Sequence, residues 1–268
     1  MVADPTKTVA SFFLWQEYRD MMMKLPANQA RRIPVHIYNT ISSTNEKLWE
    51  IVARGEIPAA AIARSQTAGR GQWGRQWQSP PGGLYLSVAL NTHIRAADAA
   101  HLTFLSTWGV ANALRHHHVP VLLKWPNDLI LQGRKLGGIK SETRLDSGQI
   151  TQAVIGIGLN WANPVPAAGI NLHRFPGHLI TSLEALAAIA VWGVFQGYSR
   201  YLSSGIDTIL VEYLKLFASQ GRRIAINGSS GVVTGVTAQG KLCVRLQSSG
   251  AAAEIELSPG AVSLGYEI

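Results

Sequence analysis

The glycine-rich stretch SQTAGRGQWGRQWQS, residues 65–79, limits most strongly what this chain can fold into. Gly69, Gly71 and Gly74 have the G-x-G-x-x-G spacing of a dinucleotide-binding turn, which must close a strand and open a helix. The preceding run AAAIARSQ has the composition of a strand, but Pro-Pro-Gly-Gly at residues 80–83 interrupts any following helix. The sequence therefore predicts a loop between two strands and argues against the dinucleotide fold.

The charge of this stretch indicates a negatively charged ligand. No Asp or Glu occurs at residues 57–97, so the carboxylate that would bind a ribose in the dinucleotide fold is missing. Arg70 and Arg75 provide permanently ionised donors beside glycines, whose bare backbone N–H groups can approach an anion. Trp77 is a candidate for stacking on a base. We interpret the loop as an anion-binding element; a solvated basic loop is the alternative.

The bulk composition is compatible with several kinds of partner. The 268 residues include 24 Lys and Arg against 16 Asp and Glu, a formal net charge of +8. Such a charge suits nucleic acid, an acidic protein or a phosphate-bearing small molecule, and does not choose among them. The lone Cys243 excludes an intrachain disulfide and favours a reducing compartment. Because no long uninterrupted apolar segment occurs, we expect a cytoplasmic protein without a membrane role.

The order of the predicted elements indicates an α+β fold. Ser43 and Glu46 have the spacing of a capping box at the start of a helix. Residues 119–161 alternate short apolar runs with turn signals, as consecutive antiparallel strands do. Together with the strands beside the glycine loop, they predict a mixed, largely antiparallel sheet covered by helices. The predicted helices cover residues 11–25, 44–55, 98–118, 182–198 and 206–220.

Composition divides the chain into three parts. Residues 1–33 form an N-terminal extension, and residues 34–221 hold the main sheet and its helices. From residue 222 to 268, short β-rich runs alternate with Gly, Asn and Ser turns, and the run AVSL at 261–264 is the last of them. This pattern predicts a small barrel-like β domain at the C-terminal end.

Two further segments carry groups typical of a binding site. KWPNDL places Lys124, Asn127 and Asp128 at a proline-fixed turn, where Asp128 is a candidate ligand for Mg²⁺ or a ribose. RKLGGIK places Lys135 before two glycines, whose bare backbone would admit a ligand beside the strand. Taken singly, a turn-forming aspartate and a surface lysine explain these residues equally well.

Five motifs occur along the chain in this order: STN, QTAGRGQWGRQW, KWPNDL, RKLGGIKSE and GIGLN. Together they resemble the motifs of the biotin protein ligases, and the resemblance extends from about Pro34 onward. The resemblance implies a class II synthetase-like biotin/lipoate ligase catalytic domain with a small C-terminal SH3-like β-barrel. It also implies that biotin and ATP, with Mg²⁺, give biotinyl-5'-adenylate and pyrophosphate. A lysine of a biotin carboxyl carrier protein, such as that of acetyl-CoA carboxylase, then attacks the adenylate. A cationic pocket suits the first step, because two anions must meet there.

The resemblance also implies roles for individual residues. Lys135 and Arg70 are expected to be catalytic, and Asp128 is the expected metal ligand. The expected biotin-binding residues are Ser43, Thr44, Asn45, Gln66, Gly69, Arg70, Gly71, Lys135 and Gly138. The expected nucleotide-binding residues are Arg70, Gly71, Gln72, Arg75, Trp77, Lys124, Asn127, Asp128, Lys135 and Asn160.

The sequence also departs from the family pattern. The family loop commonly reads G-R-G-R-R-G, and Gln72 and Trp73 stand where two arginines are expected, which lowers the charge available to retain the adenylate. The segment before Pro34 is too short for the DNA-binding domain of some family members, so we expect no DNA binding, and a monomer or a homodimer. A lipoate or octanoate ligase and a basic nucleic-acid-binding module remain alternatives. The polar STN motif and Gln66 favour biotin over a fatty acyl chain.

Overall fold

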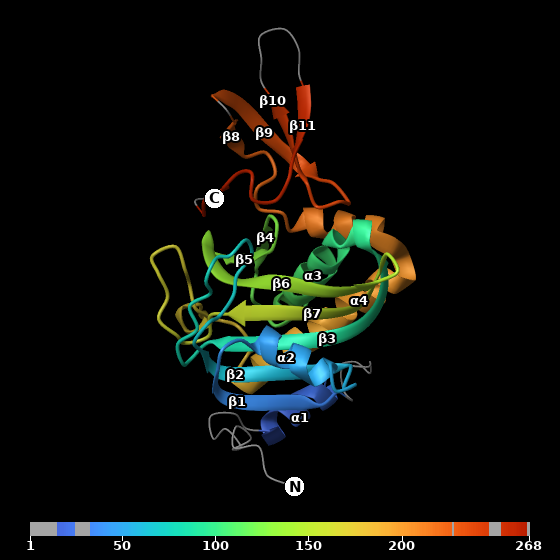
Figure 1. Ribbon diagram of the computed structural model, residues 1–268. Coiled ribbons are helices and arrows are strands. Elements are labelled where there is room, and N and C mark those ends of the chain that lie inside the picture. Colours follow the sequence, from blue (N-terminus) through green and yellow to red (C-terminus); the bar gives the residue numbers. More distant parts are fainter. Residues whose placement is uncertain (1–14, 25–32, 227, 247–252, 267–268) are drawn as a thin grey trace.

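A seven-stranded sheet forms the centre of the computed structural model, which describes residues 15–24, 33–226, 228–246 and 253–266 (Figure 1). Its strands are β1 (Val35–Ile41), β2 (Ala59–Gln66), β3 (Leu84–Arg95), β4 (Leu122–Lys124), β5 (Asp128–Leu131), β6 (Arg134–Asp146) and β7 (Gln149–Leu159). Their order is β1-β2-β3-β7-β6-β5-β4, with β1 and β2 parallel and the other neighbours antiparallel. The predicted mixed, largely antiparallel sheet is confirmed.

Helices cover both faces of this sheet (Figure 1). The helices are α1 (Trp15–Lys24), α2 (Thr44–Val52), α3 (Ala100–His116) and α4 (Leu183–Lys215), with short 3₁₀ turns η3 (Ala96–Asp98) and η4 (Leu172–Arg174). Side chains alternate along a strand, so successive residues of β2 face opposite sides of the sheet. Ile62 of β2 packs into the core that contains α3 and α4. Its neighbour Ala61 faces the other way and packs against Leu48 of α2. Among the described helices, none is both long enough and apolar enough to cross a bilayer.

The long helix α4 contains the two helices predicted separately. Gly205 has φ 74° and ψ 178°, which breaks the helical geometry and divides α4 into two arms. The second arm ends at Lys215, earlier than predicted, because the chain then pairs with β4: Leu123 donates to the carbonyl of Leu216 at 2.8 Å. Of the helix predicted at residues 11–25, α1 is described, and the remainder lies outside the described residues.

The C-terminal unit is a separate four-stranded antiparallel sheet in the order β11-β10-β9-β8. Its strands are β8 (Arg223–Ile226), β9 (Ser229–Val236), β10 (Leu242–Leu246) and β11 (Ala253–Leu257). Within the described residues this sheet does not close on itself, so the expected SH3-like barrel is not confirmed. The prediction of a strand at AVSL is wrong, because residues 261–264 form no strand. Leu264 is buried in the main core, so this run packs against the large unit instead of pairing with another strand.

The C-terminal unit is attached to the β4–β5 end of the large sheet (Figure 1). Leu242 and Val244 belong to the same apolar core as α3 and α4. In addition, the indole of Trp125 donates to the carbonyl oxygen of Gly240 at 2.9 Å. The two sheets therefore share one core, and the segment after β11, residues 258–266, returns along the large unit.

Candidate functional site

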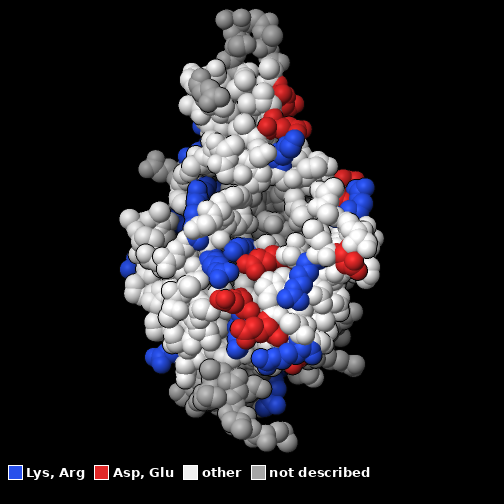
Figure 2. Space-filling view, in the orientation of Figure 1, with Lys and Arg blue, Asp and Glu red and all other residues white. Residues whose placement is uncertain are grey.

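A pocket lies on the α2 side of the large sheet, between the glycine-rich loop, β6, β7 and the C-terminal segment 258–266. All residues predicted for the site line this pocket except Gly69 and Asn160. Figure 2 shows this face hollowed below the C-terminal unit, with acidic and basic side chains gathered beneath the hollow. The sequence motifs, which are spread over more than a hundred residues, therefore meet at one place.

Glycines on two neighbouring strands make room for the pocket. Gly138 of β6 and Gly158 of β7 form a cross-strand pair and line the same wall, and Gly156 follows the same alternation. A Cβ at Gly158 would lie 2.5 Å from the Trp77 ring, and one at Gly156 would overlap the side chain of Asn45. The bare backbone thus allows the indole and the amide to lie directly against the sheet.

At the end of the pocket beside α2, the side chains of Thr44, Asn45 and Gln66 form a group of neutral hydrogen-bonding residues. The Gln66 Oε1 atom accepts from the backbone N–H of Thr44 at 2.7 Å and from its hydroxyl at 3.1 Å. The Ser87 hydroxyl lies 2.8 Å from Thr44 Oγ1 and 2.6 Å from Asn45 Oδ1. Ser87 was not predicted, although a single polar residue in the apolar strand LYLSVAL is a recognisable signal of a buried polar contact.

The start of α2 differs from the predicted capping box. Ser43 occupies the N-cap position, but its side chain makes no capping hydrogen bond and instead lines the pocket. Glu46 accepts from the Ser42 hydroxyl at 2.7 Å and lies 3.6 Å from the Arg70 guanidinium. The Ser43 side chain therefore does not cap α2, and the Glu46 carboxylate is bound to Ser42 instead.

The glycine-rich loop is a short hairpin between β2 and β3. Gly71 donates to the carbonyl of Arg75 at 2.7 Å, and Trp77 donates to the carbonyl of Gly69 at 2.9 Å. At its tip, Trp73 and Gly74 both have positive φ, 52° and 71°, as a tight hairpin turn requires. The glycine N–H groups were expected to bind an anion, and this expectation is wrong for Gly71, because its N–H bonds within the hairpin.

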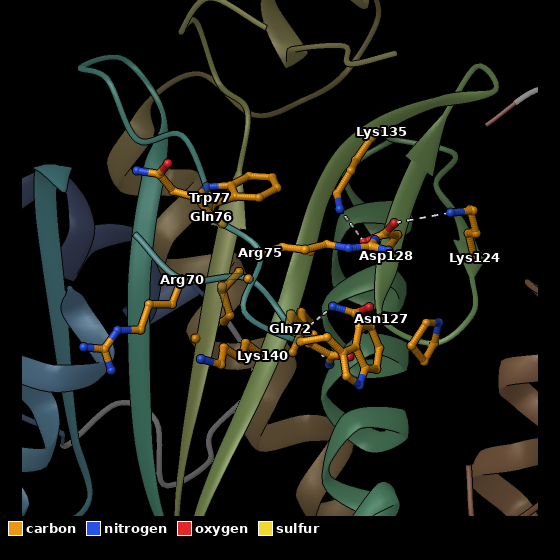
Figure 3. A pocket seen from close by; sticks show the side chains of 18 of the residues that line it. Arg70, Gln72, Arg75, Gln76, Trp77, Lys124, Asn127, Asp128, Lys135 and Lys140 are labelled. Carbon is orange, nitrogen blue, oxygen red and sulfur yellow. Dashed lines mark hydrogen bonds and ion pairs between the residues drawn. The ribbon is translucent and has the colours of Figure 1, made fainter. Parts of the chain in front are cut away.

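The charge of the loop is carried by its arginine side chains, which point in different directions. In Figure 3, Arg75 extends toward Asp128, whereas Arg70 points away toward α2, where Glu46 lies. Gln72 donates to the carbonyl oxygen of Ile139 at 3.4 Å, so it joins the loop tip to β6. Arg75 is the loop cation that points toward the lysine end of the pocket.

The opposite end of the pocket is built around one carboxylate between two lysines (Figure 3). Asp128 Oδ1 lies 2.6 Å from Lys135 Nζ, and Asp128 Oδ2 lies 3.7 Å from Lys124 Nζ. The Lys135 ammonium is also 5.3 Å from the centre of the Trp77 ring. This end combines positive charge with an aromatic face, which is the pairing that an anionic nucleotide requires.

A β-bulge places Lys135 on the pocket wall. Gly138 pairs with Asp128 and Lys135 pairs with Ile130, so three residues of β5 correspond to four of β6. Without the extra residue, Lys135 would face the opposite side of the sheet from Asp128. A hydrogen bond holds the backbone of Lys135 in place: its N–H donates to the carbonyl oxygen of Ala168 at 2.8 Å.

Burial changes the acid–base behaviour of this end of the pocket. Burial lowers the pKa of Lys124, with a contribution from nearby Lys135, while the Asp128 carboxylate opposes the decrease. Burial and the neighbouring Asp128 raise the pKa of Tyr266, whose hydroxyl donates to Asp128 Oδ2 at 2.7 Å. Tyr266 was not predicted, because nothing in the sequence links it to a residue 138 positions earlier.

The remaining predicted residues support the pocket from outside or from its edge. Asn160 lies behind the wall, where its side-chain amide donates to the carbonyl oxygen of Lys135 at 3.3 Å. Gly69 is buried where the hairpin backbone passes close to Ser79. Asn127 lines the pocket and donates to the Ile139 carbonyl at 2.6 Å.

The described residues contain no group of three His, Cys, Asp or Glu side chains that would enclose a metal ion. Among the residues that line the pocket, Asp128 is the only carboxylate. A single carboxylate is compatible with Mg²⁺, which is commonly held by one or two carboxylates together with nucleotide phosphates and water. The residues present therefore fit a metal that arrives with a nucleotide.

A pocket that is neutral at one end and cationic at the other suits a ligand with an uncharged part and an anionic part, as an enzyme that activates a small carboxylic acid requires. A sequence model of the Biotin/lipoate A/B protein ligase family matches residues 37–160. The Bifunctional ligase/repressor BirA of Escherichia coli is 33% identical over 227 residues, which cover 78% of this chain and 68% of the relative. The Biotin--[acetyl-CoA-carboxylase] ligase of Paracoccus denitrificans is 30% identical over 220 residues, 76% of this chain and 90% of the relative. This chain belongs to the biotin protein ligase family.

The fold agrees with solved structures of this family. The biotin protein ligase from Aquifex aeolicus, solved in complex with biotin and ATP, superposes with a TM-score of 0.64 and 21% identity. The superposition covers 83% of this chain and 99% of the Aquifex protein. At this level of identity, the similarity establishes a shared fold.

Proposed function

We propose that this protein is an ATP-dependent biotin protein ligase. In the first step, a biotin carboxylate oxygen attacks the α-phosphorus of ATP, the bond to the β-phosphate breaks, and biotinyl-5'-adenylate and pyrophosphate result. In the second step, a carrier-protein lysine amine attacks the acyl carbon, an amide forms, and AMP leaves. The relatives named as ligases support this reaction, and a biotin carboxyl carrier protein is the acceptor we propose.

One observation carries the proposal: a single pocket has an uncharged end and a cationic end. The uncharged end, with Thr44, Asn45 and Gln66, offers donors and acceptors suited to a neutral ureido ring. The cationic end, with Lys124 and Lys135, suits a carboxylate and a phosphate that must come together despite their repulsion. A fatty acyl chain has no partner for the polar end, which favours biotin over lipoate or octanoate.

The site residues have the following proposed roles. Lys135 stabilises the charge that develops between the carboxylate and the α-phosphate, and Trp77 faces the adenine. Arg70 and Arg75 neutralise the phosphates once the hairpin adjusts to ligand. Asp128 would hold Mg²⁺, which supplies Lewis-acid polarisation of the phosphates when bound.

The organisation of the chain remains part of the proposal. We propose a catalytic domain at residues 34–221 and a C-terminal β domain at residues 222–268, whose four strands are compatible with an incompletely described SH3-like barrel. An extension at residues 1–33, a cytoplasmic location and the lack of DNA binding likewise stay predictions. So does the choice between a monomer and a homodimer.

Exchange of labelled pyrophosphate into ATP tests the proposed reaction directly. We expect exchange that depends on biotin, and much weaker exchange with lipoate or octanoate. Transfer is followed separately with a purified carrier domain, using a variant without its acceptor lysine as the control. Exchange with lipoate alone, or none with any of the three acids, would reject the proposal.

A further inference from the structure

The C-terminal segment 258–266 brings a tyrosine to the lysine end of the pocket. The Tyr266 hydroxyl donates to Asp128 Oδ2 at 2.7 Å. Its ring lies 4.0 Å from Lys124 Nζ and 5.9 Å from Lys135 Nζ, measured to the ring centre. One side chain from the far end of the sequence thus bonds to the carboxylate, lies against Lys124 and is near Lys135.

The Tyr266 hydroxyl is one of two close partners of the Asp128 carboxylate. One carboxylate oxygen contacts Lys135 at 2.6 Å, and the other contacts Tyr266 at 2.7 Å, whereas Lys124 is farther away at 3.7 Å. Without the hydroxyl, the second oxygen keeps Lys124 as its nearest cation. The buried carboxylate then gains by turning toward Lys124, and its contact with Lys135 weakens.

The orientation of Lys135 depends on that contact. Asp128 is the one ion-pair partner that Lys135 has within the described residues, and the ammonium is otherwise placed near the Trp77 ring at 5.3 Å. The Lys135 side chain is more exposed than those of Asp128 and Lys124, at 26% against 9% for each. A partly exposed lysine with several rotatable bonds needs a fixed partner to stay oriented toward the reacting atoms.

We propose that Tyr266 is a positioning residue: its hydroxyl fixes the Asp128 carboxylate, which in turn holds the Lys135 ammonium where the acid meets the nucleotide. The inference rests on the proposed ligase function and extends the site to the C-terminal segment. The ring has a second effect, because it covers Lys124 and keeps that ammonium beside the pocket.

The substitution Tyr266→Phe separates the two effects, because it removes the hydroxyl and keeps the ring. We expect kcat of biotin-dependent pyrophosphate exchange to fall about tenfold while KM for ATP changes less than about twofold, as for loss of one charge-assisted hydrogen bond. Tyr266→Ala, which also removes the ring over Lys124, is expected to raise KM for ATP in addition. The matched control is Tyr201→Phe, whose hydroxyl lies 3.1 Å from His101 on α3, away from the pocket.

A double substitution tests whether Tyr266 acts through Lys135. If it does, Tyr266→Phe added to Lys135→Ala causes no further loss of kcat, whereas independent contributions would multiply. An unchanged kcat in Tyr266→Phe, an equal loss in Tyr201→Phe, or multiplicative losses in the double variant would each overturn the proposal. Thermal melting of every variant detects misfolding, and absence of exchange in the wild-type protein would refute the ligase function instead.

Discussion

Lys124 and Lys135 are lysines of the same pocket with different surroundings. Lys135 lies 2.6 Å from Asp128 and remains partly open to the pocket, so a ligand can reach its ammonium. Lys124 is more deeply buried and lies 3.7 Å from the same carboxylate. Because removal from water favours the neutral form of an amine, burial lowers the pKa of Lys124.

Removal of the Lys135 ammonium should affect the adenylation step most. We expect Lys135→Ala to lower biotin-dependent pyrophosphate exchange about 100-fold or more, the effect typical of losing one preorganised donor to developing charge. The matched control is Lys215→Ala on α4, where the lysine is exposed and pairs with Glu212 at 3.0 Å. Near-normal exchange in Lys135→Ala would show that this lysine is an ordinary surface residue.

Lys124 should impose an alkaline limit on activity. Burial lowers its pKa, so as pH rises this lysine loses its charge before an ordinary lysine would, and the attraction for the nucleotide falls with it. In Lys124→Arg the guanidinium stays protonated, and the alkaline limb of the kcat/KM profile for ATP should move to higher pH. The measurement covers about pH 7 to about pH 10. Superimposable alkaline limbs would contradict this assignment.

Single residues were predictable from the sequence where neighbouring residues carried the signal. The contiguous motifs identified the lysines and Asp128, and the bulge that aims Lys135 was not needed to find it. Tyr266 lacked any such signal, because only the folding of the C-terminal segment brings it to Asp128. Ser87 had a weak one, since it is polar within an apolar strand.

At the level of elements, strand β6 connects the pocket to α2. Gly138, Lys140 and Glu142 alternate along one face of β6, and the first two line the pocket. The Glu142 carboxylate accepts from the Trp49 indole of α2 at 2.9 Å and pairs with Lys140 at 3.0 Å. The sheet thereby holds α2, whose first turn carries Asn45 into the neutral end of the pocket.

Glu142→Gln should therefore weaken the attachment of α2 in a pH-dependent way. Although burial favours the neutral acid, hydrogen bonds from Lys140, Trp49 and Asn45 lower the pKa of Glu142. The folded-state pKa is below the unfolded value of about 4.3, so this stabilisation is complete above that pH and disappears as pH falls through the folded pKa.

We expect the variant to lose about 1 kcal/mol of unfolding free energy at pH 7, after allowance for screening by solvent, and less at about pH 3. Urea denaturation at the two pH values measures this difference. The control is Glu212→Gln, which removes an exposed pair with Lys215 and should cost less than about 0.5 kcal/mol at either pH. An equal loss at both pH values for Glu142→Gln would exclude the ionic explanation.

Element types followed from periodicity, and the errors arose where distant contacts decided the outcome. The periodicity of apolar residues predicted the strands on either side of the glycine-rich loop, the strands within residues 119–161 and the helices that cover the sheet. The Ser43–Glu46 capping pattern failed because Glu46 contacts Ser42 instead. The run AVSL has strand composition, yet Leu264 is buried against the large unit, which no local pattern indicates.

At the level of the whole molecule, two sheets share a single apolar core. Val233, Leu242 and Val244 of the C-terminal unit belong to the same buried cluster as α3 and α4. The indole of Trp125, next to the Lys124 turn, donates to Gly240 at 2.9 Å and ties the units together at the edge of the pocket. Composition placed a boundary near residue 221, but composition does not reveal whether a core continues across it.

This shared core should make the molecule unfold as one unit. We expect differential scanning calorimetry to give a single transition with equal calorimetric and van't Hoff enthalpies. Trp125→Phe removes the donor to Gly240, a loss of about 1 kcal/mol that should lower the Tm of that transition by about 2–4 °C. Two separable transitions, with the substitution shifting one of them alone, would show that the C-terminal unit is stable by itself. Its Tyr266 would then reach Asp128 only through docking of an independent domain, and activity should fall at a lower temperature than the large unit melts.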